Sequence, residues 1–149
     1  MTTHTLPLAI KASRAEVWNA LVNPAVTPGY YYGFAAHYPA VAGEAYSYES
    51  GGHEVIAGHV LEFVPEEKVR MTFRGSWAPD VAALDESTVT IELSDKSMGF
   101  AGVTVLTLTH EGLPDGATSH SLGQGWVVIL SGLKTLLETG QPLVQPAAA

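Results

Sequence analysis

The feature that most constrains the fold of this chain is an amphipathic pattern close to its end, at residues 124–139. Large apolar side chains recur there at intervals of three and one, which is the spacing of one helix face: Trp126, Ile129, Leu130, Leu133, Leu136 and Leu137. The pattern predicts a long helix that ends at Gly140, with Pro142 close behind. Such a stripe must be buried against another element, and only a sheet is large enough here.

The residues ahead of this helix are predicted to be mostly strands and turns. Apolar and β-branched residues gather in six segments that we expect to be strands: 5–10, 46–49, 54–64, 68–75, 87–93 and 103–110. A bulge is expected at Gly58, and residues 76–85 are expected to form a loop. The turn signals between the strands indicate an antiparallel sheet, so the fold class is α+β with six to seven strands.

Short helices are predicted after the first strand, and the first of them follows it directly. Ser13 and Glu16 have the spacing of a capping box, in which the two side chains satisfy the first free amides of a helix. The helix should place Val17, Trp18, Leu21 and Val22 on its inner side. Asn23-Pro24 should end it, because proline disfavours helical geometry in the residue before it.

Length and charge limit the classes of partner. The 149 residues are 46% hydrophobic and predict one domain, over 1–140, followed by a flexible tail over 141–149. The net charge of −8 argues against binding to nucleic acid or to anionic membranes. Cysteine is absent, which excludes disulfides and thiolate metal sites. With no apolar run of membrane-spanning length and no signal peptide pattern, we expect a cytoplasmic protein.

Three stretches, at residues 12–32, 58–69 and 105–137, resemble the START-like (SRPBCC, helix-grip) superfamily. The similarity is to the branch related to the activator of Hsp90 ATPase. The first stretch holds the capped helix and an aromatic cluster, the second a Gly-x-Val-x-Glu strand with a proline turn, and the third the last strand and closing helix. One departure is that His37-Tyr38-Pro39-Ala40 stands where many branch members carry a Ser-Asp-Trp run.

The resemblance implies a curved antiparallel sheet that grips the C-terminal helix, with a pocket between them. Members of the superfamily bind lipids, polyketides, plant hormones or other hydrophobic molecules, and some are cyclases, aromatases or hydrolases. We therefore expect a small hydrophobic molecule as the partner. Acid–base chemistry on it, of a cyclase, dehydratase or hydrolase type, stays open. The alternative is a co-chaperone-like interaction module, and a homodimer through a sheet edge is compatible with both.

The candidate ligand-binding residues are aromatic and aliphatic side chains expected to face this pocket: Tyr30, Tyr31, Tyr32, Phe34, Trp77, Leu106, Leu108, Trp126 and Leu130. Neighbouring side chains face different ways, so the three consecutive tyrosines cannot all point inward. Trp77 is expected either to close the rim of the sheet or to lie over the pocket mouth. For Trp126, core packing and a place in the pocket wall are overlapping interpretations.

Candidate proton carriers are Tyr31, His59 and His110, because histidine titrates near neutral pH and tyrosine can donate a hydrogen bond. Hydrogen-bonded or solvent-facing histidines are the competing interpretation. His59 and Glu62 are three residues apart on one strand, so they are expected on opposite faces, with Glu62 paired to Arg70 or Arg74. The six histidines match no metal-binding spacing, and no metal or cofactor is expected. Ser119 and Ser121 are interpreted as caps of the last helix.

Overall fold

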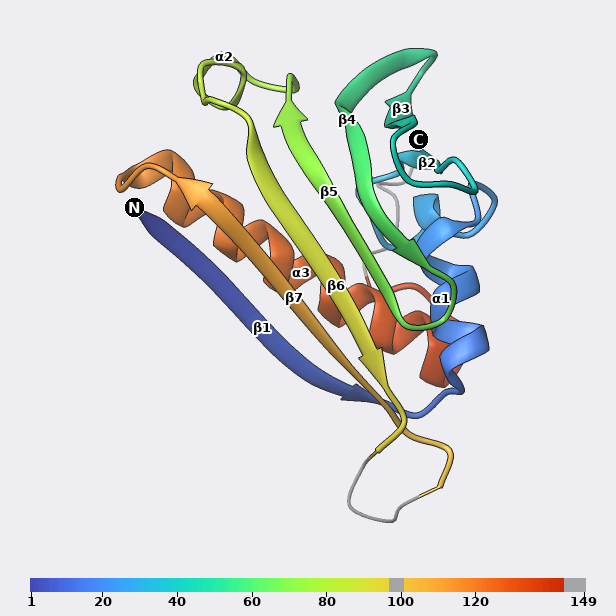
Figure 1. The fold of residues 1–149 in the computed structure, drawn as a ribbon. Helices are drawn as coiled ribbons and strands as arrows, with labels where there is room; N and C mark the ends of the chain where they lie inside the picture. Colours follow the sequence, from blue (N-terminus) through green and yellow to red (C-terminus); the bar gives the residue numbers. More distant parts are fainter. Residues whose placement is uncertain (97–100, 144–149) are drawn as a thin grey trace, which may run out of the picture.

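The computed structural model describes residues 1–96 and 101–143. They form a seven-stranded antiparallel sheet that curves around one long helix, together with shorter helices (Figure 1). In chain order the elements are β1 (Thr2–Ile10), α1 (Arg14–Val22), η1 (Thr27–Gly29), β2 (Ala35–His37), β3 (Ala45–Ser50), β4 (His53–Val64), β5 (Lys68–Gly75), α2 (Pro79–Ala82), β6 (Ser87–Ser94), β7 (Thr104–Leu113) and α3 (Ala117–Thr139). The predicted α+β class and the grip of the sheet on the C-terminal helix are confirmed. Most of the expected tail, from residue 144 onward, lies outside the described residues.

The strands lie in the order β1-β7-β6-β5-β4-β3-β2, so the first strand pairs with the last. Leu6 pairs with Leu108 and Leu8 with Leu106, which places leucines on the same face of both strands. Five further strands follow from β7 to β2 as an antiparallel series, each beside its neighbour in sequence. This topology leaves β1 and β2 as the two edges, and Pro7 lies on an edge strand as expected.

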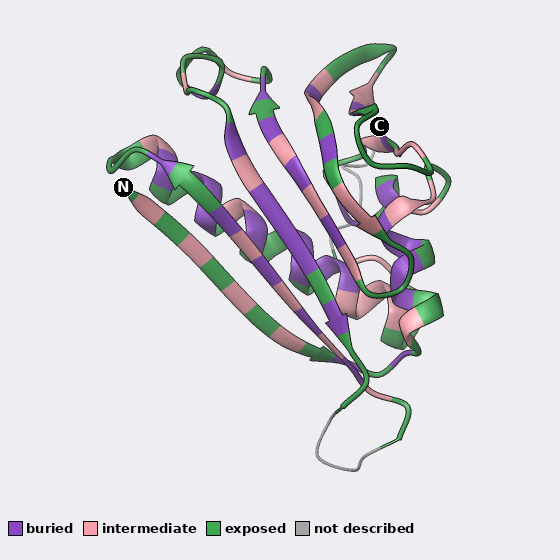
Figure 2. Ribbon diagram, in the orientation of Figure 1, coloured by how far each residue is buried: buried purple, intermediate pink, exposed green. Residues whose placement is uncertain are grey.

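Alternate residues of the central strands are buried beneath α3, which crosses the far side of the sheet in this view (Figure 2). α3 faces the sheet with one continuous stripe of buried residues: Ser119, Leu122, Gly123, Trp126, Ile129, Leu130, Gly132 and Leu133. α1 adds Val17, Trp18 and Leu21 to the same core, and the ring of Trp18 meets that of Phe63 edge to face at 5.3 Å. The core therefore fills the space between the sheet and both helices.

The last helix begins seven residues earlier than predicted, at Ala117 rather than residue 124. Ser119 and Ser121 consequently lie inside α3, and the interpretation of both as caps is wrong. Glycine has a poor intrinsic helix propensity, but tertiary packing overrides it here. Gly123 lies against the edge strand so closely that a Cβ would come within 2.5 Å of the His4 ring. The ring nitrogen Nε2 of His4 also bonds to the carbonyl oxygen of Ser119, at 2.7 Å.

Two short elements were not predicted. β2 has three residues and pairs with β3, and α2 is a four-residue helix within the segment expected to be a loop. Pro79 stands at the start of α2, where its missing N–H is not needed. Both elements are shorter than the periodicity that identifies helices and strands in a sequence.

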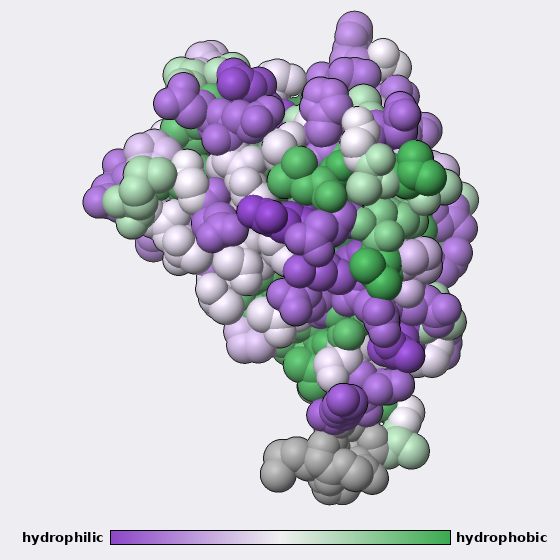
Figure 3. Space-filling view, viewed as in Figure 1, coloured by the Kyte–Doolittle hydropathy of each residue, from purple (hydrophilic) through white to green (hydrophobic). Residues whose placement is uncertain are grey.

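The outer face of the sheet, turned away from α3, is mostly hydrophilic or neutral, with apolar patches on the side of β4 (Figure 3). Leu61 and Val64 of β4 are among the exposed apolar residues. Over residues 1–96 and 101–143, no helix has the length and apolar character needed to cross a membrane.

The predicted capping box at the start of α1 is confirmed. The amide of Glu16 donates to the Ser13 hydroxyl oxygen at 3.1 Å, and the amide of Ser13 donates to a Glu16 carboxylate oxygen at 3.3 Å. We expect Ser13→Ala to lower the free energy of unfolding by about 1 kcal/mol, because an amide of the first turn loses its partner. Urea denaturation measures this change. Ser13→Asp, which keeps an acceptor, should retain most of the stability; an equal loss in both variants would contradict the assignment.

Candidate functional site

A cavity of about 580 Å³ lies between the first half of α3, α2 and the adjoining parts of β4 and β5. Its lining is largely apolar and aromatic: Tyr31, Tyr32, Phe34, Ile56, Phe73, Trp77, Ala78, Asp80, Val81, Thr118, Ser121, Leu122, Gly125, Trp126 and Ile129. The size lies within the usual range of sites for small organic molecules.

The floor of the cavity is built from buried aromatic rings. The ring of Tyr31 meets that of Trp126 edge to face at 5.8 Å, and the Phe73 and Trp126 rings lie 6.2 Å apart. All three side chains are buried, and they come from the segment after η1, from β5 and from α3. Rings held by three elements give a rigid apolar surface against which a ligand can stack.

Exposed residues mark the mouth of the cavity. Tyr32 and Trp77 are 56% and 43% exposed although both line the cavity. Between α2 and α3 the rim is polar, with the hydroxyl of Thr118 donating to an Asp80 carboxylate oxygen at 3.1 Å. This bond links α2 to the first turn of α3 and so holds one wall of the mouth.

The three consecutive tyrosines have three different environments. The Tyr30 hydroxyl donates to the carbonyl oxygen of Ala20 at 2.7 Å, so this side chain joins α1 to the core. Tyr31 points to the cavity, and Tyr32 lies at its rim. Tyr32 has a φ of 50° and is followed by Gly33 at 79°, a left-handed conformation that bulky residues rarely adopt. The backbone reverses there, which separates the directions of the three rings.

The hydroxyl of Tyr31 is the polar group at the floor of the cavity. It forms no hydrogen bond with the residues that the structure describes, whereas the Tyr30 hydroxyl has a partner. Among residues 1–96 and 101–143, the hydroxyl oxygen of Ser119 is the only side-chain polar atom that is both inaccessible to solvent and without a hydrogen-bond partner. The Tyr31 hydroxyl is therefore not fully sealed, and its side chain lines this cavity. Burial, with a smaller contribution from Tyr48, raises its pKa well above the ordinary value, so it stays protonated and can donate.

His110 is fully buried behind the cavity wall and both of its ring nitrogens are engaged. The Trp126 indole N–H donates to Nδ1 at 2.9 Å, so Nδ1 carries no proton and Nε2 does. Nε2 then donates to the hydroxyl of Ser87 at 2.7 Å, and that hydroxyl donates to the carbonyl oxygen of Phe73 at 3.4 Å. Burial, with His4 adding a smaller effect, lowers the pKa of His110 to about 4. The neutral imidazole orients the Trp126 ring.

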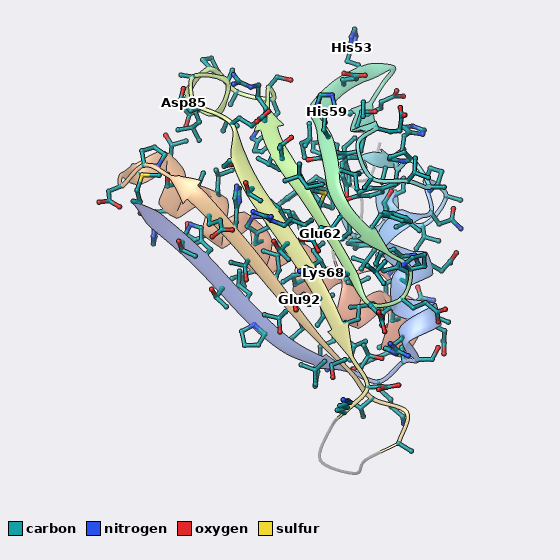
Figure 4. The ribbon with its side chains drawn as sticks, in the orientation of Figure 1. His53, His59, Glu62, Lys68, Asp85 and Glu92 are labelled. Carbon is teal, nitrogen blue, oxygen red and sulfur yellow. The ribbon has the colours of Figure 1, made fainter. Side chains whose placement is uncertain are left out.

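His59 lies on the outer face of the sheet, away from the cavity, and Glu62 lies on the same face (Figure 4). The expectation of opposite faces is wrong because the register of β4 shifts between Val60 and Glu62, which adds one residue and reverses the alternation. The predicted pairing of Glu62 is confirmed: its carboxylate lies 3.8 Å from Arg70 and 3.2 Å from Lys68.

The nine residues predicted to contact a ligand fall into two groups. Five of them line the cavity: Tyr31, Tyr32, Phe34, Trp77 and Trp126. The other four are not part of its lining and are buried in the core: Tyr30, Leu106, Leu108 and Leu130. A void beside Leu108 and Leu130 measures only about 10 Å³. The core side chains thus fill that part of the grip, and the free space lies toward the start of α3.

Several lining residues were not predicted, although some have a periodic signal. Leu122, Gly125 and Ile129 lie four, one and three residues from Trp126, which is the spacing of one helix face. Asp80 and Val81 belong to α2 and have no such signal. Within residues 1–96 and 101–143, no three His, Asp or Glu side chains are grouped closely enough to hold a metal ion.

Comparisons with known proteins agree with this architecture. DynU16, a protein in the dynemicin biosynthetic locus, superposes with a TM-score of 0.72 at 22% identity; the match covers 94% of this chain and 48% of DynU16. This chain thus spans about half the length of DynU16. Protein CV1439 from Chromobacterium violaceum has a TM-score of 0.69 at 28% identity, over 91% of this chain and 96% of CV1439.

PFC0360w, an Hsp90 activator from Plasmodium falciparum, has a TM-score of 0.72 at 21% identity, over 95% of this chain and 99% of its own. At such identities DynU16 and PFC0360w show the fold alone. None of the curated proteins compared with the chain matches it. The family model described as activator of Hsp90 ATPase homolog 1-like protein matches residues 11–138, nearly the whole folded region. The chain therefore belongs to the activator of Hsp90 ATPase homolog 1-like family, within the START-like helix-grip fold.

Proposed function

We propose that this protein is a cytoplasmic binding protein for a small hydrophobic organic molecule. The observation that carries the proposal is the aromatic cavity, whose lining includes the buried Tyr31, a side chain whose hydroxyl bonds to none of residues 1–96 and 101–143. An apolar wall with a few polar groups is the usual composition of a small-molecule site. The ligand stacks on Trp126 and Phe73 and accepts a hydrogen bond from Tyr31.

The same geometry favours binding over histidine-based acid–base chemistry. His59 lies on the other face of the sheet, and both ring nitrogens of His110 are used within the protein. Tyr31, with its raised pKa, serves as a hydrogen-bond donor toward a carbonyl, ether or hydroxyl oxygen of the ligand. A reaction in this cavity would have to rely on that donor and on the shape of the aromatic wall.

Pyrenebutanol, a neutral polycyclic alcohol, is a suitable probe for the proposal. We expect saturable binding at one site, measured by quenching of tryptophan emission and by a concentration-dependent rise in the melting temperature. Native mass spectrometry of the freshly purified protein should show a co-purified small molecule. An empty protein that is not stabilised by pyrenebutanol or by a panel of apolar compounds would contradict the proposal.

Tyr31→Phe should weaken the binding of pyrenebutanol by about two- to tenfold, since one hydrogen bond contributes about 0.5–1.5 kcal/mol. The variant should fold normally because the hydroxyl bonds to none of the residues that the structure describes. Tyr30→Phe is the matched control: it removes the bond to Ala20, so it should lower stability and leave the affinity unchanged. Fluorescence titration and urea denaturation of both variants measure the two effects. Equal affinities in Tyr31→Phe and the unaltered protein would remove Tyr31 from the site.

A second candidate function is an interaction with an Hsp90-type chaperone, which the family and the similarity to PFC0360w suggest. It predicts a complex with Hsp90 and stimulation of its ATPase rate. An ATPase assay with and without pyrenebutanol separates the two functions. Stimulation that is unaffected by the probe, in a protein that does not bind the probe, would favour the chaperone role.

A further inference from the structure

The cavity carries a single formal charge, and that charge is negative. Among the described lining residues, Asp80 is the only acidic one, and no lysine, arginine or histidine accompanies it. Resting on the binding function proposed above, we infer that the ligand is an amine-bearing aromatic compound, whose ammonium group lies at Asp80 while its rings occupy the cavity. Carboxylate-bearing compounds are disfavoured by the same arrangement.

The position of Asp80 suits a charged group that stays at the mouth. Its side chain is exposed at the rim, so the carboxylate keeps its hydration when the site is empty. One carboxylate oxygen accepts the Thr118 hydroxyl at 3.1 Å, which fixes the side chain beside the opening. No lysine, arginine or histidine of the described chain forms an ion pair with it, in contrast to Glu62 and Glu138. Asp80 is therefore a positioned anion that a ligand cation can pair with.

Aromatic side chains surround the same opening. Trp77 and Tyr32 are both partly exposed there, and the Trp77 ring lies across Gly75, where a Cβ would come within 2.4 Å of a ring carbon. The faces of tryptophan and tyrosine rings attract ammonium groups, and carboxylates gain nothing from them. An opening with two aromatic rings, one carboxylate and no basic group is the combination that recognises alkylammonium ions.

The charge of the whole molecule acts in the same direction. Seven basic and fifteen acidic residues give a net charge of −8, so the surrounding potential attracts cations and repels anions. A carboxylate-bearing ligand in the cavity would be repelled by this potential and by Asp80, and no basic residue of the described lining would pair with it. Specificity between two otherwise equal ligands follows from such an unpaired like charge.

Three probes with the same rings and different end groups test the inference: pyrenebutylamine, pyrenebutanol and pyrenebutanoic acid. We expect the amine to bind about two- to fivefold more tightly than the alcohol, the range of an exposed ion pair. The acid should bind more weakly than the alcohol, and added salt should reduce the differences. Fluorescence titration at low and high salt gives all three dissociation constants.

Asp80→Asn is the decisive variant because its amide oxygen still accepts the Thr118 hydroxyl. It should reduce the affinity for the amine to that for the alcohol when both are measured on the same variant. Asp85→Asn removes the same charge from a nearby residue that does not line the cavity, so it should preserve the preference (Figure 4). An acid that binds as tightly as the alcohol, or an amine preference that survives Asp80→Asn, overturns the inference alone. If none of the probes binds, the inference and the proposed binding function are overturned together.

Discussion

Acidification from about pH 7.5 to about pH 4 is expected to lower the free energy of unfolding by about 3 kcal/mol through His110 alone. In the folded protein the pKa of this buried imidazole is lowered to about 4. Its charged form would be desolvated, and a proton on Nδ1 would break the bond from Trp126. In the unfolded chain the same imidazole is protonated near its ordinary pKa of 6.5.

The sign follows from the protons bound in each state. Between about pH 6.5 and pH 4 the unfolded chain carries a proton on His110 and the folded protein does not, so acid favours unfolding. The stability that neutral His110 contributes is fully present above the pKa of this residue in the unfolded chain. It is lost as the pH falls toward the pKa of His110 in the folded protein. Asp115 and Glu138, whose hydrogen bonds to Thr2 and Lys134 lower their pKa values, add acid sensitivity in the same direction.

His110→Asn isolates the contribution of the imidazole. Its amide oxygen can take the place of Nδ1 as acceptor for the Trp126 indole, but it does not titrate. At pH 7.5 the variant should be less stable because the buried site loses ring volume and the bond to Ser87. Below about pH 6.5 its stability should fall less steeply than that of the unaltered protein.

Urea denaturation at several pH values gives both curves, and their difference cancels the carboxylates that the two proteins share. Parallel curves would contradict a buried neutral His110. A nitrogen-edited NMR spectrum at neutral pH provides an independent check, since the imidazole proton is expected on Nε2. A proton on Nδ1 would be incompatible with the bond from Trp126.

The parts of this fold that were predicted correctly depend on contacts and patterns among residues that are close in the sequence. The capping box of Ser13 and Glu16 is a contact between residues three apart, so the sequence contains both partners. The strand at Lys68–Gly75 has a strict alternation of Val69, Met71 and Phe73 and matches its predicted bounds. Long-range pairing of β1 with β7 has no such local code and required the structure.

The predictions that were wrong concern features set by a one-residue bulge in β4 or by tertiary packing. The bulge of β4 lies between Val60 and Glu62 and not at Gly58, so that expectation is wrong, and the bulge turns Glu62 to the outer face. The alternation of apolar and polar residues does not mark its position. α3 starts at Ala117 although the glycines of its first turns have a poor helix propensity. Gly123 packs closely against His4 of β1, and this tertiary contact favours the helix there. Asp80 lies in a helix of one turn, too short for any period. The α2 side of the mouth was therefore not predicted, although Tyr32 and Trp77 at the same mouth were.

The space beside Gly125 allows the cavity itself to be tested by filling it. Gly125 lines the mouth, and a Cβ at this position would meet only the hydroxyl of Tyr32 within 4 Å, at 3.7 Å. We expect Gly125→Phe to weaken the binding of pyrenebutanol by about tenfold or more, because the added ring occupies the volume that the ligand needs. The fold should survive, since replacing a helical glycine improves the intrinsic propensity.

Gly125→Ala is the matched control for this experiment. It should raise the free energy of unfolding by up to about 1 kcal/mol and leave the affinity nearly unchanged, because a methyl group at 3.7 Å is an ordinary van der Waals contact. Thermal denaturation and fluorescence titration of the two variants separate folding from binding. If Gly125→Phe binds the probe as tightly as Gly125→Ala does, the ligand lies elsewhere on the protein. If only Gly125→Phe loses binding while both variants melt at or above the temperature of the unaltered protein, the ligand occupies the space between Tyr32 and α3, in the cavity that Asp80 and Trp77 also line.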